Sequence, residues 1–209
     1  LLQLHFADDE GWRLQIPGLK ELTEVGARRG YTTDEQQCLY PAYGGGFDSK
    51  HRSIGTGFIS RAEFISLLRY AAQRHVTILP EIESPGHCRA ACKSMLARYN
   101  KYKESNPEKA REYLLTDLND TLRRSKPAAY DDEDLNPALP STYRFMEKVI
   151  SEISQMYDEA GLKLNAIHLG GDEVASNAWT GSPAARQLVE SENLGSEASL
   201  HGYYFARMA

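Results

Sequence analysis

The stretch "LNAIHLGGDEV" (164–174) decides the fold class, because a continuous apolar run changes abruptly into two glycines and two adjacent acids. Two earlier stretches have the same form, "LLQLHFADDEGWR" (1–13) and "VTILPEIESPGH" (76–87). Continuous rather than alternating apolar runs are typical of strands that are buried on both faces of a parallel sheet. We therefore predict three such strands, each ending in a polar and mostly acidic cluster.

Helical patterns separate these runs. Helix boundaries are signalled by a capping box (Ser60 with Glu63), by N-terminal residues (Ser141 or Thr142, and Ser182 with Pro183) and by a C-terminal glycine (Gly161). The predicted helices cover about 60–75, 86–105, 141–160 and a segment after 182. Strand and helix thus alternate three times, which predicts an α/β fold with a parallel sheet. The long connections 31–57 and 116–141 show little periodicity, and such loops are usually functional or disordered.

Composition narrows the class of protein. With 209 residues, 41% of them hydrophobic, the chain can bury a substantial core in one or two domains. Its net charge of −5 comes from interspersed charges, which argues against a nucleic acid partner. No run approaches the roughly 18 apolar residues of a membrane span. Three cysteines are too few for a disulfide framework, and we expect Cys88 and Cys92, one helical turn apart, to be free thiols.

The two ends of the chain suggest a fragment. Residue 1 already lies inside the apolar run "LLQLHF", and the last residues, "LHGYYFARMA" (200–209), have the pattern of an unfinished helix. We therefore expect residues 1–209 to be one partial domain of a larger protein.

The candidate site residues follow the three apolar runs. Ligands of parallel α/β folds bind at the carboxyl ends of the strands, so these polar clusters should converge in space. The clusters consist of Asp8 and Asp9, of Glu81, Glu83 and His87, and of Asp172 and Glu173.

Simpler interpretations exist for each of these residues. Acids after a strand often cap the next helix, and a histidine after "SPG" also fits the first turn of a helix. His5 and His168, inside apolar runs, are typical of hydrogen-bonded core residues, and Glu81 of a buried acid with a partner. Trp12 and Trp179 fit packing at the rim of a site as well as contact with a sugar.

Together, "LHFADDEGWRLQIPGLKELTEVGA", "ILPEIESPGH" and "IHLGGDEV" resemble the β-N-acetylhexosaminidases of glycoside hydrolase family 20, most closely the bacterial chitobiase-like members. The resemblance covers nearly the whole chain. It implies that the chain is part of a (β/α)8 TIM barrel, about strands 2 to 4 with their helices and long loops. It also implies a retaining exo-β-N-acetylhexosaminidase that needs no metal and no organic cofactor. The expected substrate is an oligosaccharide or glycoconjugate that ends in GlcNAc or GalNAc.

The same resemblance implies roles for individual residues. Asp172 and Glu173 occupy the positions of the catalytic pair, and Asp8 and His87 occupy positions that support the acid through hydrogen bonds. In this family the nucleophile is the substrate's own 2-acetamido oxygen, and the product of its attack is an oxazolinium ion. Trp179 is a candidate substrate-binding residue, and Arg13 and Trp12 receive no role.

Two other functions fit the same clusters. A metal-dependent barrel hydrolase also gathers His, Asp and Glu at strand ends, but "QLHFA" (3–7) lacks the usual His-x-His. A non-catalytic glycan-binding relative is the second alternative, and it normally loses the acid pair or its support first. Family members that digest chitin fragments or glycoproteins meet them outside the cytoplasm, so we expect an exported protein, periplasmic, at the cell surface or secreted.

Overall fold

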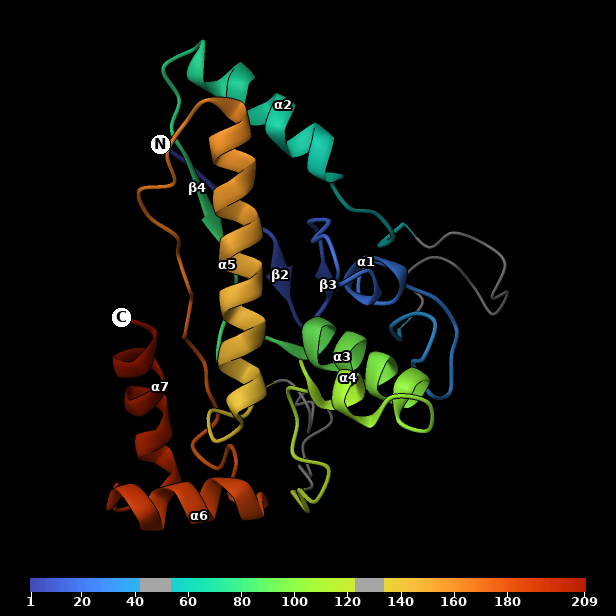
Figure 1. The fold of residues 1–209 in the computed structure, drawn as a ribbon, viewed down its shortest axis with the longest axis vertical. Coiled ribbons are helices and arrows are strands. Elements are labelled where there is room, and N and C mark those ends of the chain that lie inside the picture. Colours follow the sequence, from blue (N-terminus) through green and yellow to red (C-terminus); the bar gives the residue numbers. More distant parts are fainter. Residues whose placement is uncertain (42–53, 123–133) are drawn as a thin grey trace.

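The computed structural model describes residues 1–41, 54–122 and 134–209 (Figure 1). The strands are β1 (Leu2–His5), β2 (Ala7–Asp8), β3 (Gly11–Trp12) and β4 (Ile78–Glu81). The α-helices are α1 (Glu21–Glu24), α2 (Arg61–Ala72), α3 (Arg89–Tyr102), α4 (Pro107–Arg111), α5 (Pro140–Ala160), α6 (Pro183–Glu192) and α7 (Leu200–Met208), and a 3-10 turn covers Glu197–Ser199. No helix of these ranges has both the length and the apolar character needed to cross a membrane.

The predicted parallel sheet is present as a pair of strands with a third segment beside it. β1 and β4 run parallel, with Leu2 opposite Ile78 and His5 opposite Glu81. The third apolar run passes along the other side of β4, where His168 forms a parallel bridge with Glu81. The His168 N–H donates to the Pro80 carbonyl (2.9 Å), and the Ile82 N–H donates to the His168 carbonyl (3.0 Å). The order in space is therefore β1, β4 and the segment around His168.

Two details of the strand prediction were wrong. The third run forms an isolated bridge rather than a regular strand, because its ladder with β4 is confined to the residues around His168. β1 was expected to be buried on both faces, yet Leu2, Gln3 and His5 are exposed. Within the described ranges β4 is the only strand paired with β1, so β1 lies at the edge of this sheet.

The helix predictions were largely confirmed. The Ser60 hydroxyl accepts a hydrogen bond from the Glu63 N–H, and the Glu63 carboxylate accepts one from the Ser60 N–H, which completes the predicted capping box of α2. Gly161 ends α5 with φ +78°, and the Ser182 hydroxyl caps α6. The helix expected over 86–105 is shorter, Arg89–Tyr102. The expectation that Ser141 or Thr142 opens α5 was wrong, because the helix begins at Pro140 after Leu139 and both residues lie in its first turn. The connections 31–57 and 116–141 lie in part outside the described residues.

The main core holds the helices against the strands. α5 runs alongside β4 in Figure 1, and the Tyr157 hydroxyl of α5 donates to the Ile78 carbonyl of β4 (2.9 Å). Trp12 is buried in this core, where its ring contacts Phe145 edge-on and its indole N–H donates to the Leu14 carbonyl (2.6 Å). This packing fixes the hairpin of β2 and β3, whose turn carries the first acidic cluster. The cysteines are free thiols, as expected.

Candidate active site

Side chains from all three predicted clusters meet in a single chain of contacts. The Nδ1 atom of His87 lies 3.1 Å from Oδ2 of Asp9, and its Nε2 atom lies 3.3 Å from Oε2 of Glu173. These residues come from the β2–β3 turn, from the residues just before α3 and from the loop after the His168 bridge. The expected convergence of the clusters is therefore present in the structure.

The first acidic cluster contains a difference from the sequence prediction. Asp8 was expected to support the acid together with His87, but its nearest carboxylate oxygen lies 3.8 Å from Nδ1 of His87. Asp9 makes the direct hydrogen bond instead. The second oxygen of Asp8 lies 2.9 Å from Nε2 of His5. Successive residues point in different directions, so each aspartate has its own histidine.

The backbone around α3 holds Asp9 and His87 in place. The N–H of Arg89, the first residue of α3, donates to Oδ1 of Asp9 (3.0 Å). An aspartate at this position also receives the favourable field of the helix N-terminus. The Asp9 side chain is 11% exposed, and one of its oxygens is used for the helix and the other for His87. Asp9 therefore links the start of α3 to the histidine.

The environment favours a proton on this pair. Burial alone lowers the pKa of His87, but the hydrogen bond with Asp9 and the charges of Asp9, Asp8 and Asp172 outweigh it and raise that pKa above its usual value. Burial also raises the pKa of Asp9, against the opposing effects of the Arg89 N–H and of His87. Both shifts favour retention of a proton between Asp9 and His87, so that Nε2 can interact with the Glu173 carboxyl group.

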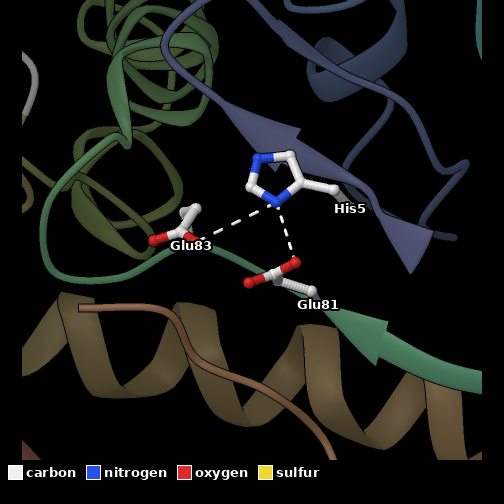
Figure 2. Close-up of side chains that lie close together, drawn as sticks. All are labelled: His5, Glu81 and Glu83. Atoms are coloured by element: carbon white, nitrogen blue, oxygen red, sulfur yellow. Dashed lines mark ion pairs between the residues drawn. The ribbon is translucent and has the colours of Figure 1, made fainter. Parts of the chain in front are cut away.

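A second cluster surrounds Glu81, the last residue of β4. Its two oxygens lie 2.9 Å from Nδ1 of His5 and 2.7 Å from Nδ1 of His168, and Gln3 donates to it as well (2.8 Å). Figure 2 shows one nitrogen of His5 facing both Glu81 and Glu83, with Glu83 the more distant at 4.0 Å. His5 is hydrogen-bonded to Asp8, and Nδ1 of His168 accepts the Gly170 N–H (3.1 Å), so both histidines are hydrogen-bonded as expected, but they are exposed rather than in the core.

Two groups of side chains in the described ranges could hold a metal ion. They are His5 with Glu81 and Glu83, and Asp8 with Asp9 and His87, and in each the ligand atoms lie within 4.8 Å of one another. In each group two of the possible ligand atoms already contact one another directly. Nδ1 of His5 lies 2.9 Å from Oε2 of Glu81, and Nδ1 of His87 lies 3.1 Å from Oδ2 of Asp9. These contacts account for the arrangement of the side chains as hydrogen-bonded pairs.

Asp172 and Glu173 lie at the open side of the site. Both are exposed, and the Glu173 side chain is 78% exposed even though His87 contacts its Oε2 atom. Glu173 lines a hollow of about 330 Å³ together with Trp179 and His201. A carboxyl group with this access can exchange a proton with a bound molecule, and the neighbouring Asp172 can accept a hydrogen bond from it.

The two tryptophans and Arg13 differ in their positions. Trp179 is buried, its indole N–H donates to the Leu135 carbonyl (2.9 Å), and it forms part of the wall of the hollow beside Glu173. Trp12 belongs to the core. The Arg13 guanidinium donates to the Gly57 carbonyl (2.9 Å) and so helps to hold the loop before α2.

Sequence reasoning missed one residue of this region and gave another no contact. His201 of α7 donates from Nε2 to the Gly171 carbonyl (2.8 Å), and no motif or spacing in the sequence connects it with the acidic pair. Glu83 was predicted as a member of the second cluster but without a partner, and in the structure it accepts the Gly171 N–H (3.3 Å). Both contact the backbone of the glycine that directly precedes Asp172.

Comparison with protein families gives a match over residues 1–209 to the model described as "Glycosyl hydrolase family 20, catalytic domain". A beta-hexosaminidase B of Pseudoalteromonas piscicida is 43% identical over 209 residues, which are 100% of this chain and 26% of that protein. An N,N'-diacetylchitobiase of Vibrio harveyi is 46% identical over 194 residues, covering 92% of this chain and 21% of that protein. The chain thus spans about a quarter of the length of these curated relatives.

Solved structures agree with these matches. A GH20 exo beta-N-acetylglucosaminidase of Vibrio harveyi, in complex with N-acetylglucosamine, superimposes with a TM-score of 0.74 at 34% identity, over 98% of this chain and 28% of that one. A beta-N-acetylhexosaminidase of Bacteroides fragilis gives a TM-score of 0.64 at 25% identity, over 99% of this chain and 32% of that one.

Proposed function

This chain belongs to glycosyl hydrolase family 20, and we propose that the protein that contains it is a retaining exo-β-N-acetylhexosaminidase. Its substrates are oligosaccharides or glycoconjugates that end in GlcNAc or GalNAc. The names of the relatives support the glycosidase activity and the N-acetylhexosamine substrate. The observation that carries the proposal is the series of contacts from Asp9 through His87 to Glu173, a hydrogen bond followed by an ion pair, which supports a carboxyl group at the open side of the site.

The proposed reaction uses the substrate's acetamido group as nucleophile. Its carbonyl oxygen attacks the anomeric carbon while Glu173 gives its proton to the departing glycosidic oxygen, so an alcohol leaves and an oxazolinium ion remains. Asp172 accepts a hydrogen bond from the acetamido N–H, which orients the group and balances its developing positive charge. The Glu173 carboxylate then takes a proton from water while the water oxygen attacks the anomeric carbon. The bond between that carbon and the oxazolinium oxygen breaks, which restores the acetamido group and gives net retention.

His87 and Asp9 support the acid in this scheme. The contact between Nε2 of His87 and Oε2 of Glu173 (3.3 Å) holds one carboxyl oxygen, which leaves the other free to meet the glycosidic oxygen. A protonated His87 also stabilises Glu173 after it has lost its proton, because the imidazolium then faces a carboxylate. Asp9 orients the ring through the opposite nitrogen.

The proposed fold of the whole domain is a (β/α)8 barrel, of which residues 1–209 supply about the second to fourth strands. The parallel order of β1, β4 and the segment around His168 supports this arrangement, as does the alternation of these strands with α2 and α5. In a closed barrel the exposed edge of β1 has a second partner, and the exposed His5 faces the interior at the carboxyl end of its strand.

The proposed activity is tested with two matched aryl glycosides and the full-length protein. We expect release of 4-nitrophenol from the N-acetyl-β-glucosaminide and almost none from the β-glucoside, because the second substrate lacks the nucleophile. Equal rates on both would contradict acetamido participation. We further propose that the protein is exported, and recovery of the full-length protein only in the cytosolic fraction of its cells would contradict this.

A further inference from the structure

Glu83 is a buried carboxyl group that the proposed reaction does not use. It lies two residues beyond β4, and its side chain is 4% exposed. Its backbone is fixed, because the Cys88 thiol donates to the Glu83 carbonyl (2.9 Å) and the next residue, Ser84, donates its N–H to the Leu169 carbonyl (2.8 Å). Burial raises the pKa of Glu83, with the Gly171 N–H opposing the shift and the Asp172 charge adding to it. A carboxyl group is costly to bury, so its contacts need an explanation.

The Glu83 carboxyl group contacts the two glycines that precede the acidic pair. Its Oε2 atom accepts the Gly171 N–H (3.3 Å). A Cβ atom added to Gly170 would overlap all three atoms of the Glu83 carboxyl group. Gly170 and Gly171 have φ of +62° and +99°, a region that residues with a side chain rarely adopt. The backbone can therefore turn this closely over Glu83 only because both positions are glycine.

The opposite side of the same turn is held by α7. Nε2 of His201 donates to the Gly171 carbonyl (2.8 Å), and a Cβ atom at Gly171 would overlap the ring of Phe205. Both polar backbone groups of Gly171 thus have a side-chain partner, Glu83 for the N–H and His201 for the carbonyl. The next residue is Asp172, so the orientation of Gly171 sets the direction in which the acidic pair leaves the turn.

We propose that Glu83 is a positioning residue, whose carboxyl oxygen fixes the Gly171 turn and thereby the placement of Asp172 and Glu173. This inference rests on the proposed function of the pair. The decisive property is that an acceptor oxygen lies close enough to accept the Gly171 N–H, and its charge is not required. A carboxyl group and a carboxamide both provide such an oxygen at the same distance from the backbone.

Two substitutions distinguish the position of the acceptor oxygen of residue 83 from its charge. Glu83→Gln keeps the length and an acceptor oxygen but removes the charge, whereas Glu83→Asp keeps the charge and withdraws it by one methylene. The matched control is Glu152→Asp, at a buried glutamate of α5 that pairs with Lys148 away from the site. Each full-length variant is assayed for kcat and KM on the N-acetyl-β-glucosaminide, and its thermal unfolding is measured so that all are compared while folded.

We expect Glu83→Asp to lower kcat on the order of 100-fold with little change in KM, since a small misplacement of catalytic groups has effects of this size. Glu83→Gln and Glu152→Asp should stay within a few-fold of the unmodified protein. Gly170→Ala provides a second measurement, because its methyl group displaces the same carboxyl group from the other side, and it should also lower kcat rather than raise KM.

Several results would overturn the inference. They are an active Glu83→Asp variant, a Glu83→Gln variant that loses as much kcat as Glu83→Asp, or a Gly170→Ala variant with unchanged kcat. The unmodified protein is tested first on both aryl glycosides. If it does not require the acetamido group, the proposed function fails and this inference fails with it. If it does require the group and Glu83→Asp remains active, only the inference about Glu83 fails.

Discussion

Replacement of Asp9 by Asn should damage catalysis far more than the same change at Asp8. Asp9 lies 3.1 Å from Nδ1 of His87 with a side chain that is 11% exposed. Asp8 lies 3.8 Å from the same atom, is 40% exposed, and has His5 as its own partner. The two positions are adjacent and undergo an identical chemical change, so each serves as the control for the other.

The expected size of the effect follows from these contacts. In the Asp9→Asn variant the carboxamide retains an oxygen for the Arg89 N–H but turns an N–H₂ group towards His87, so the charge-assisted hydrogen bond that accepts the Nδ1–H of His87 is lost. A hydrogen bond to a charged group contributes about 1.5–3 kcal/mol, which corresponds to roughly 10- to 150-fold in rate. An exposed ion pair such as that of Asp8 contributes about 1 kcal/mol or less, or about fivefold at most.

The assay is kcat of the full-length variants on an unactivated N-acetylhexosamine disaccharide, since proton donation to the leaving group limits this substrate most. Circular dichroism of each variant verifies that the fold is retained. The reasoning is refuted if Asp8→Asn lowers kcat as much as Asp9→Asn, because the distances and exposures would then fail to distinguish the two carboxylates.

Two further predictions concern the acid and its histidine. Glu173→Gln should lower kcat strongly on substrates with poor leaving groups and much less on activated aryl glycosides, because a phenolate leaves without protonation; equal losses on both classes would remove Glu173 from the acid role. The pKa of His87 is raised above 6.5 in the folded state, so the stabilisation from its protonated ring is complete below that pH and is lost as the pH rises through the raised pKa. The free energy of unfolding, measured with denaturant at a series of pH values, should therefore decline less steeply over this range in His87→Gln, and an unchanged slope would contradict the shift.

Local signals in the sequence predicted most of the helical framework. Signals that begin or end a helix depend on residues within about one turn of the chain, so they can be recognised without knowledge of the tertiary structure. The correct ones here are Ser60, Gly161 and the pair of Ser182 with Pro183. The extent of the third strand could not be predicted in this way. Whether an apolar run forms a ladder depends on its neighbours, and residues around His168 pair with β4 only over a short distance.

The candidate site was predicted at the level of clusters rather than of contacts. The prediction that residues after parallel strands lie together at one edge of the sheet holds for Asp9, His87 and Glu173. The choice between Asp8 and Asp9 depends on the direction of each side chain in a two-residue hairpin strand, which composition and spacing do not contain. His201 could not be found at all, because its contact with Gly171 arises from the packing of α7.

The most direct test of substrate assistance is a pair of inhibition constants for the unmodified protein and for Asp172→Asn. A thiazoline that mimics the cyclised intermediate should bind Asp172→Asn more weakly. The catalytic rate should fall in parallel, because the transition state loses stabilisation on the order of 2–4 kcal/mol, or roughly 30- to 1000-fold in rate. A gluconolactone-type ring mimic without the acetamido group should bind both proteins about equally. If the thiazoline binds both proteins equally while the catalytic rate still collapses, Asp172 is not the acetamido partner and the proposed mechanism is wrong.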